Sequence, residues 1–279
     1  YDNASDFSEG LAAVNKDGKW GFINKKGKEV IACQDNYVFN FSDGLARVIK
    51  DGKYGLINME GTAIVNCRYD QLYKFSNGLA PAKNDGKWGF INTDGTEVIN
   101  CQYDNITFFS NGMAPVSKND NWGVINTEGT EVVKCLYDDT SDLSDGLIMV
   151  EKNEKCGFFN TKGKEVIKFQ YDDASDFSEG LAAVEKDGKW GFINKKGKEI
   201  IKFRYDDAIS FSEGLASVEK DEKWGFINKK GKTVLKFKYD FFEGFFDGLG
   251  IVEKDGKLGL ITPKGKEIVK CQYDSIYWD

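Results

Sequence analysis

Six cysteines are the most reactive side chains of this sequence, and five of them recur at one position of a repeating pattern. Elsewhere in the pattern the same position holds phenylalanine. A position that accepts either Cys or Phe is typical of apolar packing, where a thiol behaves as a small hydrophobic group. No Cys-x-x-Cys pair and no histidine accompanies these cysteines, so we expect free thiols and no metal site. The position is occupied by Cys33, Cys67, Cys101, Cys135 and Cys271, and by Phe169, Phe203 and Phe237.

Carboxylates recur as well, in Tyr-Asp pairs that include Asp172, Asp206 and Asp240, with Asp176 nearby. A calcium loop needs closely spaced oxygen ligands, and these carboxylates lack that spacing. Aspartate often accepts a hydrogen bond from a nearby backbone amide in an Asx turn. We therefore interpret them as turn residues at the junction between repeats.

Catalysis has little support in the sequence. The chain has no histidine, and Cys156, the one cysteine outside the Cys/Phe position, has no local base. A hydrolase with paired carboxylates would need one repeat to diverge sharply from the others, and we identify no such repeat. The sequence predicts neither enzyme activity nor a cofactor.

An aromatic residue followed by glycine recurs along the chain, and a row of such rings can stack on sugars. The alternative is that each ring packs on a glycine of the adjacent unit and seals the core between sheets, which we favour because Leu258 replaces the ring in one unit. The aromatic positions are Trp20, Tyr54, Trp88, Trp122, Trp190 and Trp224. The glycines are Gly21, Gly55, Gly89, Gly123, Gly157, Gly191, Gly225 and Gly259.

The spacing of these glycines defines the elements that would position all of the residues above. Each glycine lies 34 residues after the one before, and eight units of 34 residues with a partial ninth at 273–279 fill the chain. No insertion, linker or change of composition interrupts the pattern. We therefore predict one repeat domain over residues 1–279.

Within one unit, residues 171–204, three apolar stretches alternate with polar turns. LAAVEK, KWGFIN and KEIIKF are predicted strands of an up-and-down meander, and YDDASDF is an extended or turn-like lead-in. NKKGK predicts a type I turn followed by a glycine bulge, and KDGK a second hairpin turn of the same kind. Glycine inside KWGFIN predicts close approach of an aromatic ring. No stretch has helical periodicity.

Two of the three strands are apolar on both faces, as Phe192 beside Ile193 shows, so neighbouring units must cover each sheet. The predicted fold class is all-β, with eight tandem β-meander units in a β-propeller-like ring or in an open superhelical stack, a solenoid. Pro81 and Pro115 share one position of the first strand. Since proline cannot donate to a ladder, that strand is predicted to be the edge of a three-stranded sheet. The ninth lead-in would cap an open stack.

The segments FS-x-G-L, K-x-G-K-W-G-F-I-N and G-K-E-V-I together resemble the WG-repeat, or KWG-repeat, proteins of bacteria, and the resemblance spans the chain. It implies a tandem β-repeat with a binding or scaffolding role, without a defined reaction or catalytic residues. Cys156 and Leu258 depart from the pattern at its hallmark position, so the resemblance implies no role for Trp in those two units.

Composition narrows the range of partners. Lys and Arg number 38 against 45 Asp and Glu, and the net charge of −7 disfavours nucleic acid and anionic membranes. No long apolar run and no signal-peptide pattern occurs, so membrane insertion is not expected. We expect a soluble protein, either cytoplasmic or exported with its leader removed.

Units that differ from their siblings are the best places to look for a partner surface. The last unit contains FFEGFFDGLGIV, with Phe241, Phe242 and Phe246 at positions that are mostly polar or small elsewhere. The fifth has Ile148 and Met149 at positions that are mostly Ala or polar. Exposed, these side chains would mark an interface. We predict a non-catalytic scaffold that binds another protein; the alternative is a carbohydrate or cell-surface module that uses the Trp row.

Overall fold

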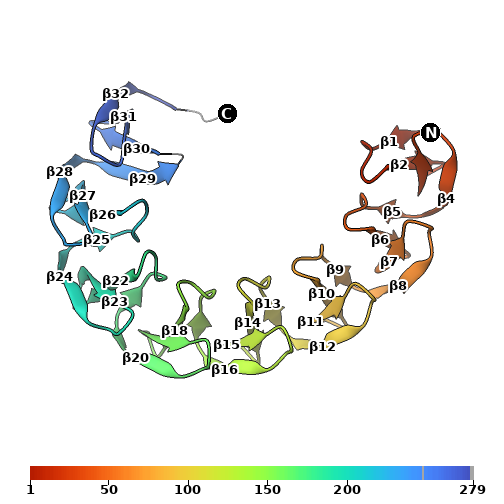
Figure 1. Cartoon of the computed structure of the whole chain (residues 1–279), viewed down its shortest axis with the longest axis horizontal. Helices are drawn as coiled ribbons and strands as arrows, with labels where there is room; N and C mark the ends of the chain where they lie inside the picture. Colours follow the sequence, from red (N-terminus) through yellow and green to blue (C-terminus); the bar gives the residue numbers. More distant parts are fainter. Residues whose placement is uncertain (247, 277–279) are drawn as a thin grey trace. The chain divides into compact units, whose positions relative to one another are not determined.

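The structure, a computed structural model, describes residues 1–246 and 248–276, without the side chains of residues 243 and 246 (Figure 1). The residues that it describes form 32 strands joined by turns. The described residues form no helix, and so none that is long and apolar enough to cross a membrane. The prediction of an all-β fold built from tandem units is confirmed.

Each unit forms a four-stranded antiparallel sheet in which strands adjacent in the chain are adjacent in the sheet. In the sixth sheet β21 (Asp173–Ala174) pairs with β22 (Leu181–Lys186), β22 with β23 (Lys189–Asn194), and β23 with β24 (Glu199–Tyr205). The three predicted strands are present. The prediction of a three-stranded sheet is wrong, because the lead-in contributes a two-residue strand at the edge.

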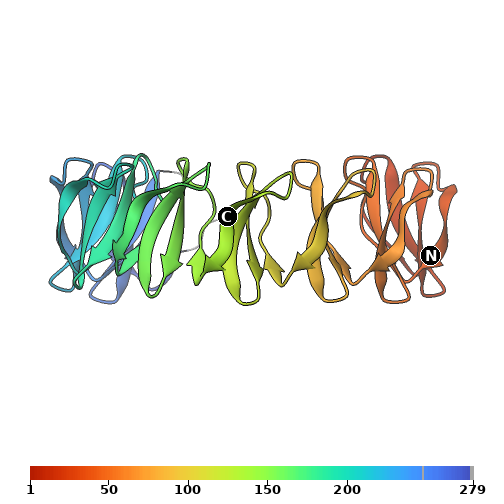
Figure 2. The same cartoon turned by 90° about the horizontal axis from the view of Figure 1, so that it is seen from below.

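The other sheets repeat this order (Figure 2). The first three sheets comprise β1 (Asn3–Ala4), β2 (Leu11–Lys16), β3 (Lys19–Asn24) and β4 (Glu29–Asp35); β5 (Tyr37–Val38), β6 (Leu45–Lys50), β7 (Lys53–Asn58) and β8 (Ala63–Tyr69); and β9 (Gln71–Leu72), β10 (Leu79–Asn84), β11 (Lys87–Asn92) and β12 (Glu97–Tyr103). The fourth and fifth comprise β13 (Asn105–Ile106), β14 (Met113–Lys118), β15 (Asn121–Asn126) and β16 (Glu131–Tyr137); and β17 (Asp139–Thr140), β18 (Leu147–Lys152), β19 (Lys155–Asn160) and β20 (Glu165–Tyr171). The last two comprise β25 (Asp207–Ala208), β26 (Leu215–Lys220), β27 (Lys223–Asn228) and β28 (Thr233–Tyr239); and β29 (Phe241–Phe246), β30 (Leu249–Lys254), β31 (Lys257–Ile261) and β32 (Glu267–Tyr273).

Two kinds of turn close the hairpins. Between β22 and β23 both Asp187 and Gly188 are left-handed, with φ of 52° and 71°, which is the pattern of a two-residue type I′ turn. KDGK is therefore not of the predicted bulge type. Between β23 and β24 Gly197 is left-handed (φ 74°), and the Oδ1 of Asn194 accepts hydrogen bonds from two amides of the same turn. NKKGK is thus the predicted type I turn with a glycine bulge.

The glycine inside the third strand faces a bulge in the fourth strand of its own sheet. Pairing shifts between Trp190↔Tyr205 and Phe192↔Ile201. A Cβ on Gly191 would lie 2.7 Å from the carbonyl oxygen of Ile201, too close for any side chain. The group that approaches Gly191 is backbone, so the predicted aromatic ring is wrong for this copy, whereas a ring carbon of Phe237 lies 3.0 Å from the equivalent point at Gly225.

The proline position of the second strand is explained by how its amide is used. The amide of Ala183 in β22 donates to the hydroxyl of Ser175 in the lead-in, and not to a strand carbonyl. Pro81, at the equivalent position, has no N–H group to donate. Its carbonyl oxygen still accepts a hydrogen bond from the amide of Tyr73 at 2.9 Å. Proline is tolerated here, and at Pro115, because the sheet ladder does not need this N–H group. The strand is nevertheless an inner one.

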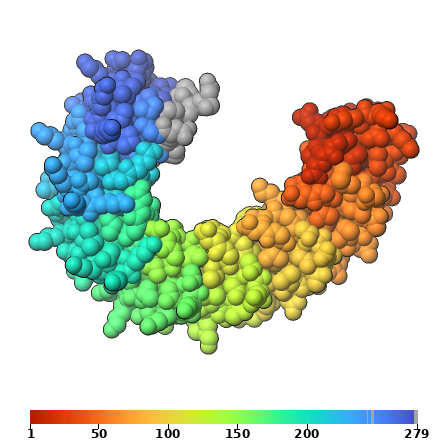
Figure 3. Space-filling view, in the orientation of Figure 1, coloured from red at the N-terminus to blue at the C-terminus, as the bar shows by residue number. Residues whose placement is uncertain are grey.

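The chain divides into two compact units, Tyr1–Glu131 and Val132–Asp279, which we treat separately. The prediction of one domain over residues 1–279 stays a prediction. Within each unit consecutive sheets pack face to face, and side chains fill the space between them (Figure 3).

Apolar side chains of two consecutive sheets form each core. In the first unit the ring of Phe22 packs on that of Phe41 from the next sheet, with ring centroids 4.8 Å apart. Phe192 and Phe211 repeat the contact at 4.9 Å in the second unit. Each such buried side chain contributes roughly 1.5–3 kcal/mol. Neighbouring sheets thus cover one another, as the double-sided apolar strands predict.

Polar side chains connect consecutive sheets at the turns. The Oδ2 of Asp206 accepts the amide of Asp221 at 2.8 Å, and its Oδ1 pairs with Lys189 of the preceding sheet at 2.5 Å. The lysine first and the amide second hold the pKa of Asp206 below its usual range. The repeated aspartates are therefore junction residues, as predicted, but they bridge two sheets and do not form a local Asx turn. The same pairs are Lys53–Asp70, Lys87–Asp104, Lys155–Asp172, Lys223–Asp240 and Lys257–Asp274.

Candidate binding surface

Aromatic side chains gather along the lead-in segments of the unit Tyr1–Glu131. Exposure is 47% for Tyr37, 43% for Tyr73 and 46% for Phe108. With the half-buried Phe39 and the buried Trp88 they form a surface that we call the aromatic face. Large exposed rings that lie together on one face are typical of binding surfaces.

The rings of the aromatic face hold one another in two groups. In the first, Tyr37 lies 5.6 Å from Trp20 and 5.2 Å from Phe39, between ring centroids. In the second, Tyr73 stacks on Trp88 at 5.4 Å and meets the edge of Phe108 at 5.6 Å. Such ring pairs contribute about 0.5–1.5 kcal/mol each beyond the area that they bury. The rings are therefore held in place before any partner arrives.

Arg47 lies between these two groups. Its guanidinium carbon is 4.0 Å from the centroid of Phe39, and its Nη1 donates to the carbonyl of Leu72 at 2.9 Å. Burial lowers the pKa of the guanidinium, although arginine stays charged at any physiological pH. The aromatic face thus carries one fixed positive charge among its rings.

A shallow pocket of about 220 Å³ opens within the second ring group. Its apolar walls come from Tyr73, Trp88 and Phe108, and Asn105 and Thr107 supply polar groups. The lining includes no His, Asp, Glu, Lys or Cys. The arrangement favours contact and recognition.

The local reason for the exposed rings lies in one position of the lead-in. In the sixth sheet that position is Ser175. Its hydroxyl accepts a hydrogen bond from the backbone amide of Ala183 and therefore turns inward. Phe39 and Tyr73 occupy the same position in the second and third sheets. A ring does not replace the hydroxyl acceptor. In the third sheet Pro81 stands at the donor position and has no N–H group, so the two substitutions are matched there, whereas Arg47 in the second sheet keeps its N–H group.

Among the members of the predicted partner surface whose side chains the structure describes, only Phe241 is well exposed, at 49%. Phe242 is 4% exposed and packs on Phe226, with ring centroids 4.5 Å apart. It takes the inward position of the lead-in, which Ala208 holds in the preceding sheet. The prediction that Phe242 is a surface residue is therefore wrong, and the side chain of Phe246 lies outside the described residues.

The predicted pair in the fifth sheet is also inside. Ile148 is fully buried, and Met149 is half-buried against the core that includes Phe158 and Phe177. Ile148 is equivalent to Ala182, which packs in the core shared with the preceding sheet, so the larger side chain fills space and forms no surface. The prediction of an exposed patch here is wrong.

The Trp row seals the cores between sheets, as its packing interpretation predicts. Trp88 and Trp224 are 9% and 8% exposed, and Trp224 packs with Phe226 and Tyr239. The remaining members, Trp20, Tyr54, Trp122 and Trp190, are half-buried. They do not form a row of open platforms for sugar rings.

The cysteines are free thiols in positions that disfavour reactivity. Burial raises the pKa of Cys156 to about 12 and that of Cys101 to about 11, so both stay protonated near neutrality. Within residues 1–246 and 248–276 no three Cys, Asp or Glu side chains lie close enough to hold a metal ion.

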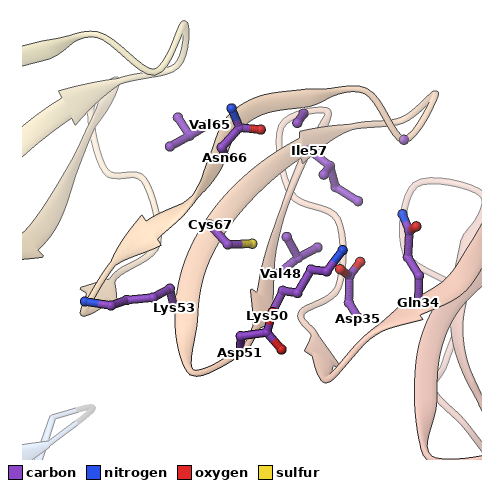
Figure 4. A pocket seen from close by; sticks show the side chains of 12 residues that line it. Gln34, Asp35, Val48, Lys50, Asp51, Lys53, Ile57, Val65, Asn66 and Cys67 are labelled. Carbon is purple, nitrogen blue, oxygen red and sulfur yellow. The ribbon is translucent and has the colours of Figure 1, made fainter.

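One sharply divergent residue escaped the sequence analysis. Asp35 stands where the other copies of the repeat have tyrosine, and it is 5% exposed at the end of β4. Its carboxylate lines a cavity of about 350 Å³ (Figure 4). Aligning the nine lead-ins by position reveals it, because the usual Tyr-Asp pair becomes Asp35-Asn36. The expectation that no unit diverges sharply is therefore wrong.

Comparisons with known proteins were made for both sequence and structure. Curated protein sequences give no match. Among solved structures, one described as the crystal structure of the eukaryotic initiation factor is 11% identical, with a TM-score of 0.49 over 95% of this chain and 86% of that one. Kluyveromyces lactis Hsv2 is 10% identical, with a TM-score of 0.39 over 79% and 87%. Likeness this low carries no argument about shape or function.

The family profile described as WG containing repeat matches nearly the whole chain. Its copies cover residues 1–20, 20–54, 54–88, 88–122, 122–156, 157–190, 190–224, 224–257 and 259–277. These boundaries coincide with the Trp-Gly positions whose role in the sheets is described above. The chain therefore belongs to the family of WG-repeat proteins.

Proposed function

We propose that this protein is a non-catalytic scaffold, and that the aromatic face of the unit Tyr1–Glu131 binds another protein. The observation that carries the proposal is the exposure of Tyr37, Tyr73 and Phe108, between 43% and 47%, at positions where most sibling repeats hold polar residues. Framework positions of the repeat stay constant while these positions vary, which is expected of a scaffold that presents a surface.

The composition of the aromatic face fits a protein partner. Tyrosine, tryptophan and arginine are the residues most enriched at the centres of protein interfaces. Arg47, fixed over Phe39, adds a charge that would orient a carboxylate of the partner. A matching partner surface therefore presents apolar side chains with an acidic residue among them.

Carbohydrate binding is the second candidate, and one observation favours it. The pocket of about 220 Å³ combines ring walls from Tyr73 and Phe108 with the polar groups of Asn105 and Thr107. A sugar would use this pocket, to which one member of the Trp row, Trp88, contributes a wall. Trp88 lines the pocket, so its fluorescence would report an oligosaccharide there, and an unchanged spectrum at millimolar oligosaccharide would contradict this candidate.

The experiment that tests the scaffold compares partner capture by two variants. The face variant combines Tyr37→Ser, Tyr73→Ser and Phe108→Ser. The control is Ile209→Ser, which removes an exposed apolar side chain (42% exposed) from the unit Val132–Asp279. A protein that the wild type captures from an extract of the source cells is identified, purified and titrated against all three chains.

We expect the face variant to bind that partner at least tenfold more weakly, because a single interface hot spot commonly contributes about 2 kcal/mol. Ile209→Ser should bind as the wild type does. Equal affinities for the wild type and the face variant, with both folded by circular dichroism, would contradict the proposal.

A further inference from the structure

The contact between consecutive sheets normally includes a buried tyrosine. It ends the fourth strand of one sheet, and its ring lies beside the Cys/Phe position of the next sheet: the centroids of Tyr205 and Phe237 are 6.2 Å apart. Tyr205 is 2% exposed. A phenol ring thus fills the space between the fourth strands.

The tyrosine hydroxyl commonly reaches a glutamate at the start of that next strand. Tyr69 donates to Glu97 at 2.9 Å, and Tyr239 donates to Glu267 at 2.8 Å. Three positions therefore work together at such an interface: the tyrosine, the Cys/Phe residue beside its ring, and the glutamate beyond its hydroxyl.

At the interface between the first two sheets the tyrosine and the glutamate are both replaced. Asp35 stands in place of the tyrosine and Ala63 in place of the glutamate, while Cys67 is the smaller of the two residues found at the third position. The ring and its hydrogen-bond partner are thus lost together. The cavity of about 350 Å³ lies at this place, within the unit Tyr1–Glu131.

The walls and the floor of the cavity differ in chemistry. Val48, Ile57 and Val65 are buried apolar walls, and the sulfur of Cys67 lies between them and the strand edge (Figure 4). Burial first, and Asp35 second, raise the pKa of the Cys67 thiol, which therefore stays neutral. Most of the remaining lining is polar or charged, with Gln34, Asn66, Lys50, Lys53 and Asp51, so the cavity joins an apolar wall to a polar rim that includes the Asp35 carboxylate.

The carboxylate of Asp35 lacks a partner among the described residues. It accepts no hydrogen bond and forms no ion pair within 4.0 Å, although the ammonium of Lys50 points toward it (Figure 4). Burial raises the pKa of Asp35, and the charges of Lys50 and Lys19 offset part of that effect. Lys50 is exposed, so its side chain can move aside at little cost.

We propose that this cavity binds a small flat aromatic molecule that carries paired N–H donors, of the amidine or imidazole class. The ring takes the place of the missing phenol between the fourth strands, and the N–H groups donate to the Asp35 carboxylate. The carboxylate oxygens of Asp35 face the cavity and have no partner within the described part of the chain, and a carboxylate gains most from paired, charged donors. The volume is at the lower end of the range for small-molecule sites, about 300–1,000 Å³. This site is independent of the aromatic face and of the scaffold function.

The test is a calorimetric titration of the whole chain with benzamidine at pH 7. Benzoate, which has the same ring and the opposite charge, is the control ligand. Asp35→Asn keeps the shape of the side chain and removes its charge, whereas Asp35→Tyr restores the residue of the sibling interfaces and fills the cavity. Near-ultraviolet circular dichroism establishes that each variant is folded.

We expect wild-type protein to bind benzamidine and not benzoate, Asp35→Asn to bind at least tenfold more weakly, and Asp35→Tyr not to bind. Tyr205→Ala opens a comparable cavity without a carboxylate and serves as a further control, with binding as weak as that of Asp35→Asn. Absence of benzamidine binding to the wild type at millimolar concentration would overturn the proposal, as would undiminished binding to Asp35→Tyr.

Discussion

The two compact units share one framework and differ in what they add to it. In the unit Tyr1–Glu131 the lead-ins carry exposed rings at Tyr37, Tyr73 and Phe108, and one interface between sheets contains Asp35 and a cavity. In the unit Val132–Asp279 the equivalent lead-in positions of the fifth and sixth sheets hold aspartate and serine, and tyrosines fill the interfaces.

This difference distinguishes two kinds of position in the repeat: framework positions, which the fold needs, and free positions, which it does not. The left-handed glycines, the bulge glycine and the inward aromatic and aliphatic residues recur in both units, because backbone geometry and core packing require them. The third, fifth and sixth positions of the lead-in are not required by either. Function in a repeat protein of this kind is expected at positions that the framework leaves free. Among the described side chains, exposed rings at these positions are Tyr37, Tyr73 and Phe108 in the first unit and Phe241 in the second.

The largest effect is expected from making a regular interface resemble the divergent one. Tyr205→Asp removes a ring that is 2% exposed and leaves a carboxylate between Phe237 and the preceding core. We expect a loss of about 3–5 kcal/mol in the free energy of unfolding, from the cavity and from the buried charge. Urea titration followed by circular dichroism measures it.

Asp35→Tyr is the matched variant, because it makes the divergent interface resemble the regular ones. A cavity already exists there, so the added ring should stabilise the protein or leave its stability unchanged. If Tyr205→Asp and Asp35→Tyr lowered the free energy of unfolding equally, the interface at Asp35 would be as tightly packed as the one at Tyr205, which would contradict the account.

A smaller effect is expected from pH, with opposite signs for two aspartates. Burial raises the pKa of Asp35, so the stability of the wild type relative to Asp35→Asn should fall as pH rises from about 4 through the folded-state pKa. Lys189 lowers the pKa of Asp206, so the stability of the wild type relative to Asp206→Asn should fall as pH drops through that lowered value. Urea titrations of the three chains between pH 3 and pH 8 would reveal the two trends, and the same sign for both would contradict these assignments.

The smallest effect is expected at a turn of the second unit that departs from the consensus. Glu222 has a φ of 60° where most units have glycine. Glu222→Gly should raise the free energy of unfolding by up to about 1 kcal/mol, because glycine adopts this conformation without strain. Gly188→Glu, at the same position of the preceding sheet, is the reverse control and should lower it by a similar amount. If Glu222→Gly instead lowered the free energy of unfolding, the left-handed conformation of residue 222 would not be what limits stability at this turn.

Much of the framework could be predicted from the sequence, since turn glycines and double-sided apolar strands reflect local geometry. The edge strand Asp173–Ala174 could not, because two residues show no periodicity. The sequence predicts a ring at Gly191, because a bulge in the neighbouring strand leaves no mark in the residues around the glycine. Asp35 could have been identified from the sequence, because its lead-in is the one that does not begin with tyrosine. The exposure of Tyr73 could not, because it depends on how Pro81 and its neighbours pack.

The choice between a propeller-like ring and an open stack stays a prediction. Small-angle X-ray scattering tests it, because a closed ring of 279 residues should have a radius of gyration near 19 Å, and an open stack a larger one.

The central claim is that the aromatic face is the binding surface, and site-specific photo-crosslinking tests it most directly. A photoreactive phenylalanine analogue is placed at Tyr37 or Tyr73 in the first unit, and at Asp173 or Asp207 in the second. After irradiation with the purified partner, we expect adducts from Tyr37 and Tyr73 and none from the two aspartate positions. Adducts confined to Asp173 and Asp207, or equal from all four positions, would contradict the account.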